Sequence, residues 1–271
     1  MKDLTVLLAL ALCAWTGTDG AQPADYPSKP IRLVVGFAPG GAADSVARAM
    51  SDAFAKALGQ PVVVDNKPGA GSSIAADMVA KAPADGYTLL IASPSSISVN
   101  PALNPKLPYT PHDLLPVTKI TTSPLVLAVN PATGIRSVAD LIAKAKKDPG
   151  KLNYSTSGNG SAPHLAAALF SQLTGVQMTH VPYRGGAPAI ASVMAGDTDL
   201  TFGTSPSVLP HANGGKLAVL AVSTRERSAL VPDLAVPQPF ACHSGRSIRR
   251  HEHYARSSGA NTTHTIAWTS F

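Results

Sequence analysis

Short apolar runs alternate with amphipathic stretches over most of the chain, and this alternation predicts strands and helices in turn. The first apolar run, 31–35, leads through a glycine-rich loop into the stretch 43–58, where apolar residues recur at helical spacing. The apolar stripe of that expected helix consists of Val46, Met50, Phe54 and Leu58. Further strands are expected at 62–64, 87–92, 125–129, 152–155, 179–181, 200–202 and 217–222, and further helices at 72–81, 137–147, 163–173, 187–194 and 206–212. Such alternation is typical of parallel α/β layers, and Tyr87 is expected in their core.

A stretch rich in proline and asparagine, 94–116, interrupts this alternation. It predicts a break between two α/β layers, because its composition favours turns over regular elements. We therefore expect a first α/β domain at 25–122 and a second at 123–234. A segment of different composition, 235–271, follows them.

The first 24 residues have the layout of a secretory signal peptide: a short basic start, an apolar run at 4–15, then small and polar residues. The apolar run is shorter than the roughly 20 residues that span a bilayer. Cleavage is expected between residues 20 and 24, which leaves an exported, soluble protein. A lipoprotein anchor at Cys13 and a buried N-terminal helix are the alternatives, and the leucine before Cys13 argues against the anchor.

Composition narrows the possible classes of protein. Hydrophobic residues make up 45% and charged residues 14%, which is typical of a folded chain rather than a disordered one. Aromatic residues make up only 5%, which argues against a stacking platform for nucleic acid. The cysteines, Cys13 and Cys242, are too few for a disulfide framework or a four-thiolate zinc site. We expect no cofactor and no nucleic-acid partner, and the net charge of +6 is modest.

Two glycine-rich loops, one in each half, lie between an expected strand and an expected helix: 36–44 (GFAPGGAAD) and 155–161 (STSGNGS). Glycines let the backbone approach a ligand closely. The helix that follows offers unpaired N–H groups and the positive end of its dipole. Two such helix starts facing each other across a cleft would bind an anion, most simply a carboxylate. Asp44 is expected to cap the first of these helices and Ser161 the second.

Competing motifs fail at specific positions. The first loop has Ala42 and Ala43 where a P-loop needs Lys and Ser or Thr, and the second has Pro163 in place of the third glycine of a dinucleotide fingerprint. No G-x-S-x-G nucleophile elbow is present. Ser161 and His164, three residues apart at a helix start, leave a cleft hydrolase as the alternative function. No third catalytic group is evident, so we favour Ser161 as a cap and His164 as a residue facing the cleft or the core.

Several long motifs occur in order and resemble the Bug family, the extracytoplasmic solute receptors associated with tripartite tricarboxylate transporters. The motifs are YPSKPIR (26–32), GFAPGGAAD (36–44), VVVDNKPGAGSSIAADMVAKAPADGYTLL (62–90), PLVLAVNP (124–131), NYSTSGNGSAPHLA (153–166), HVPYRGGAPAI (180–190) and GKLAVLAVSTRERS (215–228). The resemblance covers roughly 27–234. It implies a two-domain periplasmic binding protein of the Venus-flytrap type, type II-like, in which backbone amides of both glycine loops hold a small carboxylate, partly through ordered water.

The resemblance implies ligand-binding residues in both glycine loops and in a third cleft segment, with Ser93 at a strand end as a further candidate. The implied residues are Phe37, Ala38, Pro39, Gly40, Gly41, Ala42 and Asp44 in the first loop, Ser157, Gly158, Asn159, Gly160, Ser161 and His164 in the second, and Tyr183, Arg184 and Gly185 in the third segment. Arg184 has two interpretations, a bidentate carboxylate clamp or a hinge or surface arginine. Asp44 is expected to cap its helix rather than touch the ligand.

The chain departs from the family pattern after residue 234. The family continues with P-D-x-P-T-x-x-E-x-G where this chain reads PDLAVPQ (232–238), and from Gln238 the hydrophobic periodicity is lost. A shifted reading frame would produce such a composition. The alternatives are a disordered basic tail, or metal binding by Cys242, His243, His251, His253 and His264, whose spacing fits no zinc motif. We expect a disordered tail at 235–271 and an incomplete first domain, because the family's closing elements are missing.

The resemblance implies a periplasmic receptor that captures a small organic carboxylate and has no catalytic activity. Its expected partners are the integral membrane subunits of a tripartite tricarboxylate transporter, and the receptor itself is expected to be a monomer. A truncated receptor without function is the remaining alternative. Backbone amides recognise a carboxylate without specifying the rest of the molecule, so the sequence does not name the ligand.

Overall fold

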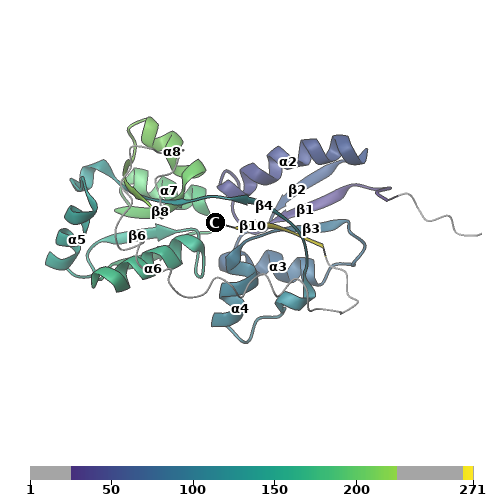
Figure 1. The fold of residues 1–271 in the computed structure, drawn as a ribbon, viewed down its shortest axis with the longest axis horizontal. Helices are drawn as coiled ribbons and strands as arrows, with labels where there is room; N and C mark the ends of the chain where they lie inside the picture. Colours follow the sequence, from purple (N-terminus) through teal and green to yellow (C-terminus); the bar gives the residue numbers. More distant parts are fainter. Residues whose placement is uncertain (1–25, 225–264, 271) are drawn as a thin grey trace, which may run out of the picture.

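The structure, a computed structural model, describes residues 26–224 and 265–270. These residues form two five-stranded sheets, each covered by helices, which lie side by side in Figure 1. The sheets confirm the α/β class predicted from the sequence. The expected signal peptide at 1–24, Cys13, Cys242 and the tail at 235–264 with its four histidines lie outside the described residues.

The first sheet has the strand order β2-β1-β3-β10-β4, and every neighbouring pair in it is parallel. Its strands are β1 (Ile31–Val35), β2 (Val62–Asn66), β3 (Thr88–Ala92), β4 (Leu115–Thr122) and β10 (Thr265–Ser270). The helical segments of this unit are α2 (Ala42–Leu58), η1 (Ala70–Ser72), α3 (Ser73–Ala80), η2 (Ser95–Val99), α4 (Asn100–Leu103) and η3 (Pro111–Asp113). Figure 1 shows α2 on one face of the sheet and α3 on the other.

Alternate residues of β1 supply two separate cores in this unit, because successive side chains of a strand point to opposite faces. Leu33 and Val35 pack with Ala47 of α2, whereas Val34 packs with Ala75 and the rest of the buried face of α3. The predicted stripe of α2 is wrong. Its buried residues are Ala43, Asp44, Ala47 and Ser51, whereas Val46, Met50 and Phe54 are half-buried and Leu58 is exposed. Small residues let the helix lie close to the sheet.

Two strands of the first sheet differ from the sequence-based expectation. Strand β4 lies at the end of the proline-rich stretch, where no strand was expected, because most of its residues are exposed and give little apolar pattern. Strand β10 lies between β3 and β4, so the expectation of a disordered tail is wrong for residues 265–270. Its sequence TIAWTS combines β-branched and aromatic residues, which favour strands, and backbone pairing on both edges stabilises it.

The second sheet has the order β7-β6-β8-β5-β9. Its strands are β5 (Leu125–Val129), β6 (Asn153–Thr156), β7 (Thr179–Pro182), β8 (Leu200–Thr204) and β9 (Ala218–Val222), and its helical segments are η4 (Pro131–Thr133), α5 (Val138–Lys147), α6 (Ala162–Thr174), α7 (Gly186–Ala195) and α8 (Ser205–Asn213). Strand β5 pairs antiparallel with both β8 and β9, so the prediction of purely parallel layers is wrong here. The chain passes directly from β4 into β5 with no crossover helix. Strand β5 therefore begins at the end of the sheet where the parallel strands β6 and β8 finish.

Helices cover both faces of the second sheet. On one face, Leu127 and Phe202 of the sheet pack with Leu141 of α5 and Phe170 of α6. The rings of Phe170 and Phe202 lie 5.6 Å apart. The other face packs against α7 and α8 through smaller aliphatic residues. No helix among the described residues is long and apolar enough to cross a bilayer.

Candidate functional site

A cavity of about 40 Å³ lies between the two units, and the N-terminal ends of four helices reach it. We call it the first cavity. Gly41 and Ala42 come from the start of α2 and Gly186 from the start of α7, while Ser161 and Thr204 are the cap residues that precede α6 and α8. The described residues that line it include none with a charged side chain. An anion bound there would be held by helix dipoles and backbone N–H groups, as expected for two of these helices from the glycine loops.

Three of these four helices begin without a side-chain cap. Within the described parts of the chain, Gly41, Gly185 and Thr204 make no capping hydrogen bond to the first turns of α2, α7 and α8. The first turn of a helix has N–H groups with no partner in the helix. The starts of α2 and α7 therefore leave such donors beside the first cavity, whereas at the start of α8 the Ser205 amide donates to the carbonyl oxygen of Pro124 at 3.0 Å.

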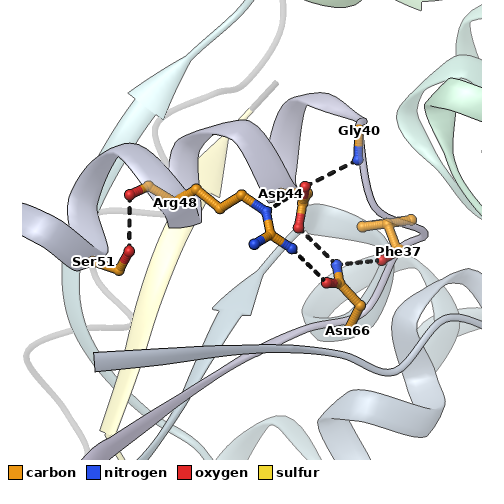
Figure 2. A network of polar contacts seen from close by, with 6 residues as sticks. All are labelled: Phe37, Gly40, Asp44, Arg48, Ser51 and Asn66. Carbon is orange, nitrogen blue, oxygen red and sulfur yellow. Dashed lines mark hydrogen bonds and ion pairs between the residues drawn. The ribbon is translucent and has the colours of Figure 1, made fainter. Parts of the chain in front are cut away.

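Asp44 holds the first loop in place, but it does not cap α2 as the sequence predicted (Figure 2). The cap position is Gly41, and Asp44 lies in the first turn with 3% of its surface exposed. Its carboxylate accepts hydrogen bonds from the Gly40 amide at 2.9 Å, from Arg48 Nε at 3.0 Å and from Asn66 Nδ2 at 3.0 Å. Burial alone would raise the pKa of Asp44, but these hydrogen bonds outweigh it and lower that pKa below its ordinary value.

Asn66 extends this network to the backbone of the loop. Its Nδ2 also donates to the carbonyl oxygen of Phe37 at 3.0 Å, and its Oδ1 accepts from Arg48 Nη2 at 3.3 Å. Because Asn66 ends strand β2, the network joins the loop after β1 to the neighbouring strand (Figure 2). The first loop is thereby tied to strand β2 by hydrogen bonds within the protein.

Two stacked histidines support the second loop. The ring of His164 lies 4.2 Å from that of His180, and His180 also stacks on Tyr154 at 5.0 Å. His164 Nδ1 accepts a 3.1 Å hydrogen bond from the Gly160 amide, and His180 Nε2 lies 2.7 Å from Thr156 Oγ1. Burial lowers the pKa of His164, and burial together with His164 lowers the pKa of His180 to about 4. Both rings are therefore neutral at physiological pH.

Ser161 caps α6, as predicted, and its geometry does not suit a nucleophile. Its Oγ accepts from the backbone amide of His164 at 3.4 Å, while the Nδ1 of that histidine is occupied by the Gly160 amide. Among the described residues, no hydrogen bond joins Ser161 Oγ to the His164 ring. A serine nucleophile needs a base within hydrogen-bond reach of its oxygen.

The loops of the two units touch each other beside the first cavity. The Ala38 amide donates a 2.9 Å hydrogen bond to the carbonyl oxygen of Arg184. A Cβ added at Gly185 would lie 2.8 Å from the Ala38 nitrogen, so only a glycine allows this approach. The third segment, residues 183–185, therefore lies beside the first loop.

The expected ligand-binding residues fall into three groups. Those lining the first cavity are Phe37, Gly41, Ala42, Ser157 and Ser161. Those lining a second cavity, of about 360 Å³, are Ser157, Gly158, Asn159, Tyr183 and Arg184. Those lining neither are Ala38, Pro39, Gly40, Asp44, Ser93, Gly160, His164 and Gly185.

Ser93 does not line the first cavity, but its hydroxyl lies 2.6 Å from the hydroxyl of Ser95, which does. Three further lining residues were not predicted from the sequence: Ser95 at the start of η2, and Thr201 and Thr204 on β8. For Ser95 and Thr204 the available signal was the same as for the glycine loops, a small polar residue where a strand ends and a helix begins, whereas Thr201 lies inside β8 and gave no such signal. Tyr87, expected in the core, is only half-buried, and its hydroxyl accepts a 2.8 Å hydrogen bond from the Ser28 amide.

Residues 46–242 match a family described as the tripartite tricarboxylate transporter family receptor. Protein BugT of Bordetella pertussis is 39% identical over 240 residues, which cover 87% of this chain and 73% of BugT. A UPF0065 protein of the same organism is 36% identical over 235 residues, covering 86% of this chain and 73% of the relative.

Solved structures agree with these sequence matches. A periplasmic transporter protein is 42% identical with a TM-score of 0.75, over 78% of this chain and 71% of that one. An R. palustris protein solved with adipate is 38% identical with a TM-score of 0.76 and the same coverage. MatC from Rhodopseudomonas palustris, with bound malate, is 32% identical with a TM-score of 0.74, over 78% of this chain and 72% of MatC. The chain therefore belongs to the family of periplasmic receptors for tripartite tricarboxylate transporters.

Proposed function

We propose that this protein captures a small organic carboxylate in the first cavity and presents it to the membrane subunits of a tripartite tricarboxylate transporter. The observation that carries the proposal is the convergence of four helix N-termini on one cavity, which no charged side chain lines among the residues that the structure describes. Such a site suits a carboxylate, since N–H groups and helix dipoles stabilise negative charge. Membership of the receptor family, and relatives solved with adipate and malate, support the same ligand class.

Ligand capture would use a hinge between the two units. The segment 123–124 joins β4 of the first sheet to β5 of the second, and it is the natural place for rotation. In this proposal the first domain is 25–122, the second is 123–234, and the segment 1–24 directs export to the periplasm. The receptor acts as a monomer.

The proposed receptor binds its ligand without changing it. The cap role of Ser161 and the occupied Nδ1 of His164 support this, because they leave the described cleft without an activated nucleophile. Ligand recovered from the complex should be chemically unchanged by mass spectrometry. A hydrolysed or otherwise altered product would support the cleft hydrolase instead.

Thermal unfolding of residues 22–271 with a panel of mono-, di- and tricarboxylates tests the proposal. A carboxylate that binds the native state raises the midpoint by mass action, by an amount that grows with its concentration. Titration calorimetry of that carboxylate should give one site per chain, and light scattering should give a monomer. A cooperative transition that no carboxylate shifts would contradict the proposed function, and the absence of any cooperative transition would support the truncated, non-functional alternative.

A further inference from the structure

A second contact joins the two units, apart from the backbone hydrogen bond between their loops described above. It is made by Gly71 of η1 and Asn100 of α4 in the first unit, and by Gly158, Asn159 and Gly160 of the second glycine loop. We call it the glycine contact. Asn100 and Gly160 line neither cavity, so the proposed function leaves both without a role.

Glycines let the two backbones approach more closely here than any side chain would allow. A Cβ added at Gly71 would lie 2.2 Å from the carbonyl oxygen of Asn159, and one added at Gly160 would lie 2.1 Å from Asn100 Oδ1. Both glycines also have a left-handed backbone, with φ of 59° and 70°. Space and backbone conformation therefore each require glycine at these two positions.

Asn100 holds the first-unit side of the contact in shape. Its Nδ2 lies within hydrogen-bond distance of the carbonyl oxygens of Ala70 at 3.1 Å and Gly71 at 3.2 Å, and of Ser73 Oγ at 2.8 Å. Because the amide nitrogen is turned toward this segment, the amide oxygen is turned toward Gly160 of the other unit. One half-buried side chain thus fixes the turn before α3 and also forms part of the surface that meets the second unit.

The second-unit side is held from within its own unit. The Gly158 amide donates to Thr156 Oγ1 at 3.2 Å, and the Gly160 amide donates to His164 Nδ1 at 3.1 Å. Among the residues that the structure describes, no hydrogen bond crosses the glycine contact. Its strength therefore depends on the fit of two backbone surfaces, each shaped by its own unit, and a turn displaced on either side loses many close contacts at once.

We propose that Asn100 is a positioning residue for closure of the two units: it shapes the turn before α3 into the surface on which Gly160 packs when the units close. The inference deepens the proposed function, since a receptor that closes around its ligand needs contacts that favour the closed arrangement. It assigns Gly160 to the contact between the units rather than to the ligand.

A double-mutant cycle across the contact tests this assignment. Gly160→Ala should lower the ratio of closed to open protein about tenfold, because its Cβ meets the Asn100 oxygen. In the Asn100→Ala background the same substitution should lower the ratio less than about threefold, because the space of the amide oxygen is then free. The strain of alanine at the backbone of residue 160 is common to both comparisons and cancels.

Pulsed electron paramagnetic resonance between spin labels measures the ratio directly. The labels are placed on cysteines at Lys56 and Lys146, exposed residues of α2 in the first unit and α5 in the second, in residues 22–271 with Cys242→Ser. Distance distributions are recorded for the protein alone and with adipate or malate at millimolar concentration. The short distance reports the closed arrangement and the long distance the open one.

Matched controls separate the contact from strain and from loss of structure. Gly175→Ala imposes the same left-handed strain, with φ of 67°, where an added Cβ meets nothing within 4 Å. Asn104→Ala removes an exposed asparagine of the same unit that lies away from the glycine contact. Both should keep the wild-type ratio. Gly160→Ala leaves every hydrogen bond of Asn100 in place, so it tests the contact even where Asn100→Ala lowers the unfolding midpoint.

The outcomes distinguish this inference from the proposed function. Effects of Gly160→Ala that are equal in the two backgrounds, or a Gly160→Ala ratio equal to that of wild type, overturn the inference and leave carboxylate capture intact. If neither adipate nor malate binds, the cycle is read on the protein alone. A wild-type protein that shows only the long distance under every condition overturns the contact in solution.

Discussion

The Ala38 amide donates a 2.9 Å hydrogen bond to the carbonyl oxygen of Arg184, and this bond joins the first loop of one unit to the third segment of the other. Both partners are backbone groups, so the hydrogen bond depends on how closely the backbones of these two segments approach each other. Gly185, next to Arg184, makes that approach possible. We therefore expect this approach of the two loops to be sensitive to a single methyl group at Gly185.

Gly185→Ala should weaken ligand binding. The new Cβ would lie 2.8 Å from the Ala38 nitrogen, and the backbone of Ala38 cannot yield as a flexible side chain would. We expect the dissociation constant to rise about tenfold, the equivalent of one hydrogen bond of the closed state. Calorimetry with the carboxylate identified by the thermal panel measures the effect.

Gly214→Ala is the matched control, because a Cβ there meets nothing closer than 3.5 Å and the backbone φ of −83° suits alanine. It should bind as wild type. If Gly185→Ala also bound as wild type, the contact between Ala38 and Arg184 would have no part in closure.

Ala42→Pro should separate the stability of α2 from anion binding. Ala42 is the first residue of α2, where proline is well tolerated, and Gly41 before it is extended with ψ of 173°, as a residue before proline prefers. The substitution removes one N–H from the first cavity. We expect an almost unchanged unfolding midpoint and a dissociation constant about tenfold higher. Ala42→Val adds bulk but keeps the N–H, so equal losses in both variants would contradict a donor role.

Asp44→Asn should destabilise the protein in a pH-dependent way. The folded state lowers the pKa of Asp44, so the ionised carboxylate contributes stability above its ordinary pKa of about 3.9 and loses it as the pH falls through the lower folded value. At pH 7 we expect a loss of about 2 kcal/mol, typical of hydrogen bonds to a buried charge. Urea unfolding from pH 2.5 to 7 should show the difference shrink in acid. Asp140→Asn, at an exposed carboxylate in the first turn of α5, is the control and should lower stability at pH 7 by less than Asp44→Asn does.

His180→Phe should flatten the dependence of stability on pH between 4 and 6.5. The folded pKa of His180 is about 4, below the ordinary value, so between the two values the unfolded chain binds a proton that the folded chain does not. Wild-type stability is therefore complete above pH 6.5 and declines toward pH 4. Phenylalanine keeps a ring between Tyr154 and His164 but cannot titrate. Urea midpoints at half-unit pH intervals measure the slope, and a slope as steep as that of wild type in His180→Phe would contradict this prediction.

The sequence pattern was sufficient for the local part of the architecture. The strand at 31–35, the glycine loop after it and the start of α2 follow from residues that are neighbours in the chain, and the structure has them at nearly the expected positions. The same holds for the loop before α6 and for its cap, Ser161. Both helix starts follow the carboxyl ends of strands, where open α/β sheets bind ligands, and both reach the first cavity although they belong to different sheets.

Features that depend on distant partners were not predictable in this way. The run LVLAV at 125–129 indicates a buried strand but not its direction, which is set by its pairing with β8 and β9. Asp44 resembles a cap by sequence, yet its partner Asn66 comes from β2 and holds it inside the first turn of α2. Strand β4 has few buried apolar residues, so its sequence did not predict a strand. Its pairing with β10, rather than burial, defines it.

The neutral lining of the first cavity has a consequence for how the binding site can vary over evolution. Every residue except proline carries the same backbone N–H, so most substitutions at positions such as Ala42 or Ala162 change the shape of the cavity without removing a donor. Affinity for an anion is then encoded in the path of the chain, while selectivity among anions can drift with the side chains. Point mutations in such receptors can therefore change which ligand is bound while the backbone donors for negative charge are kept.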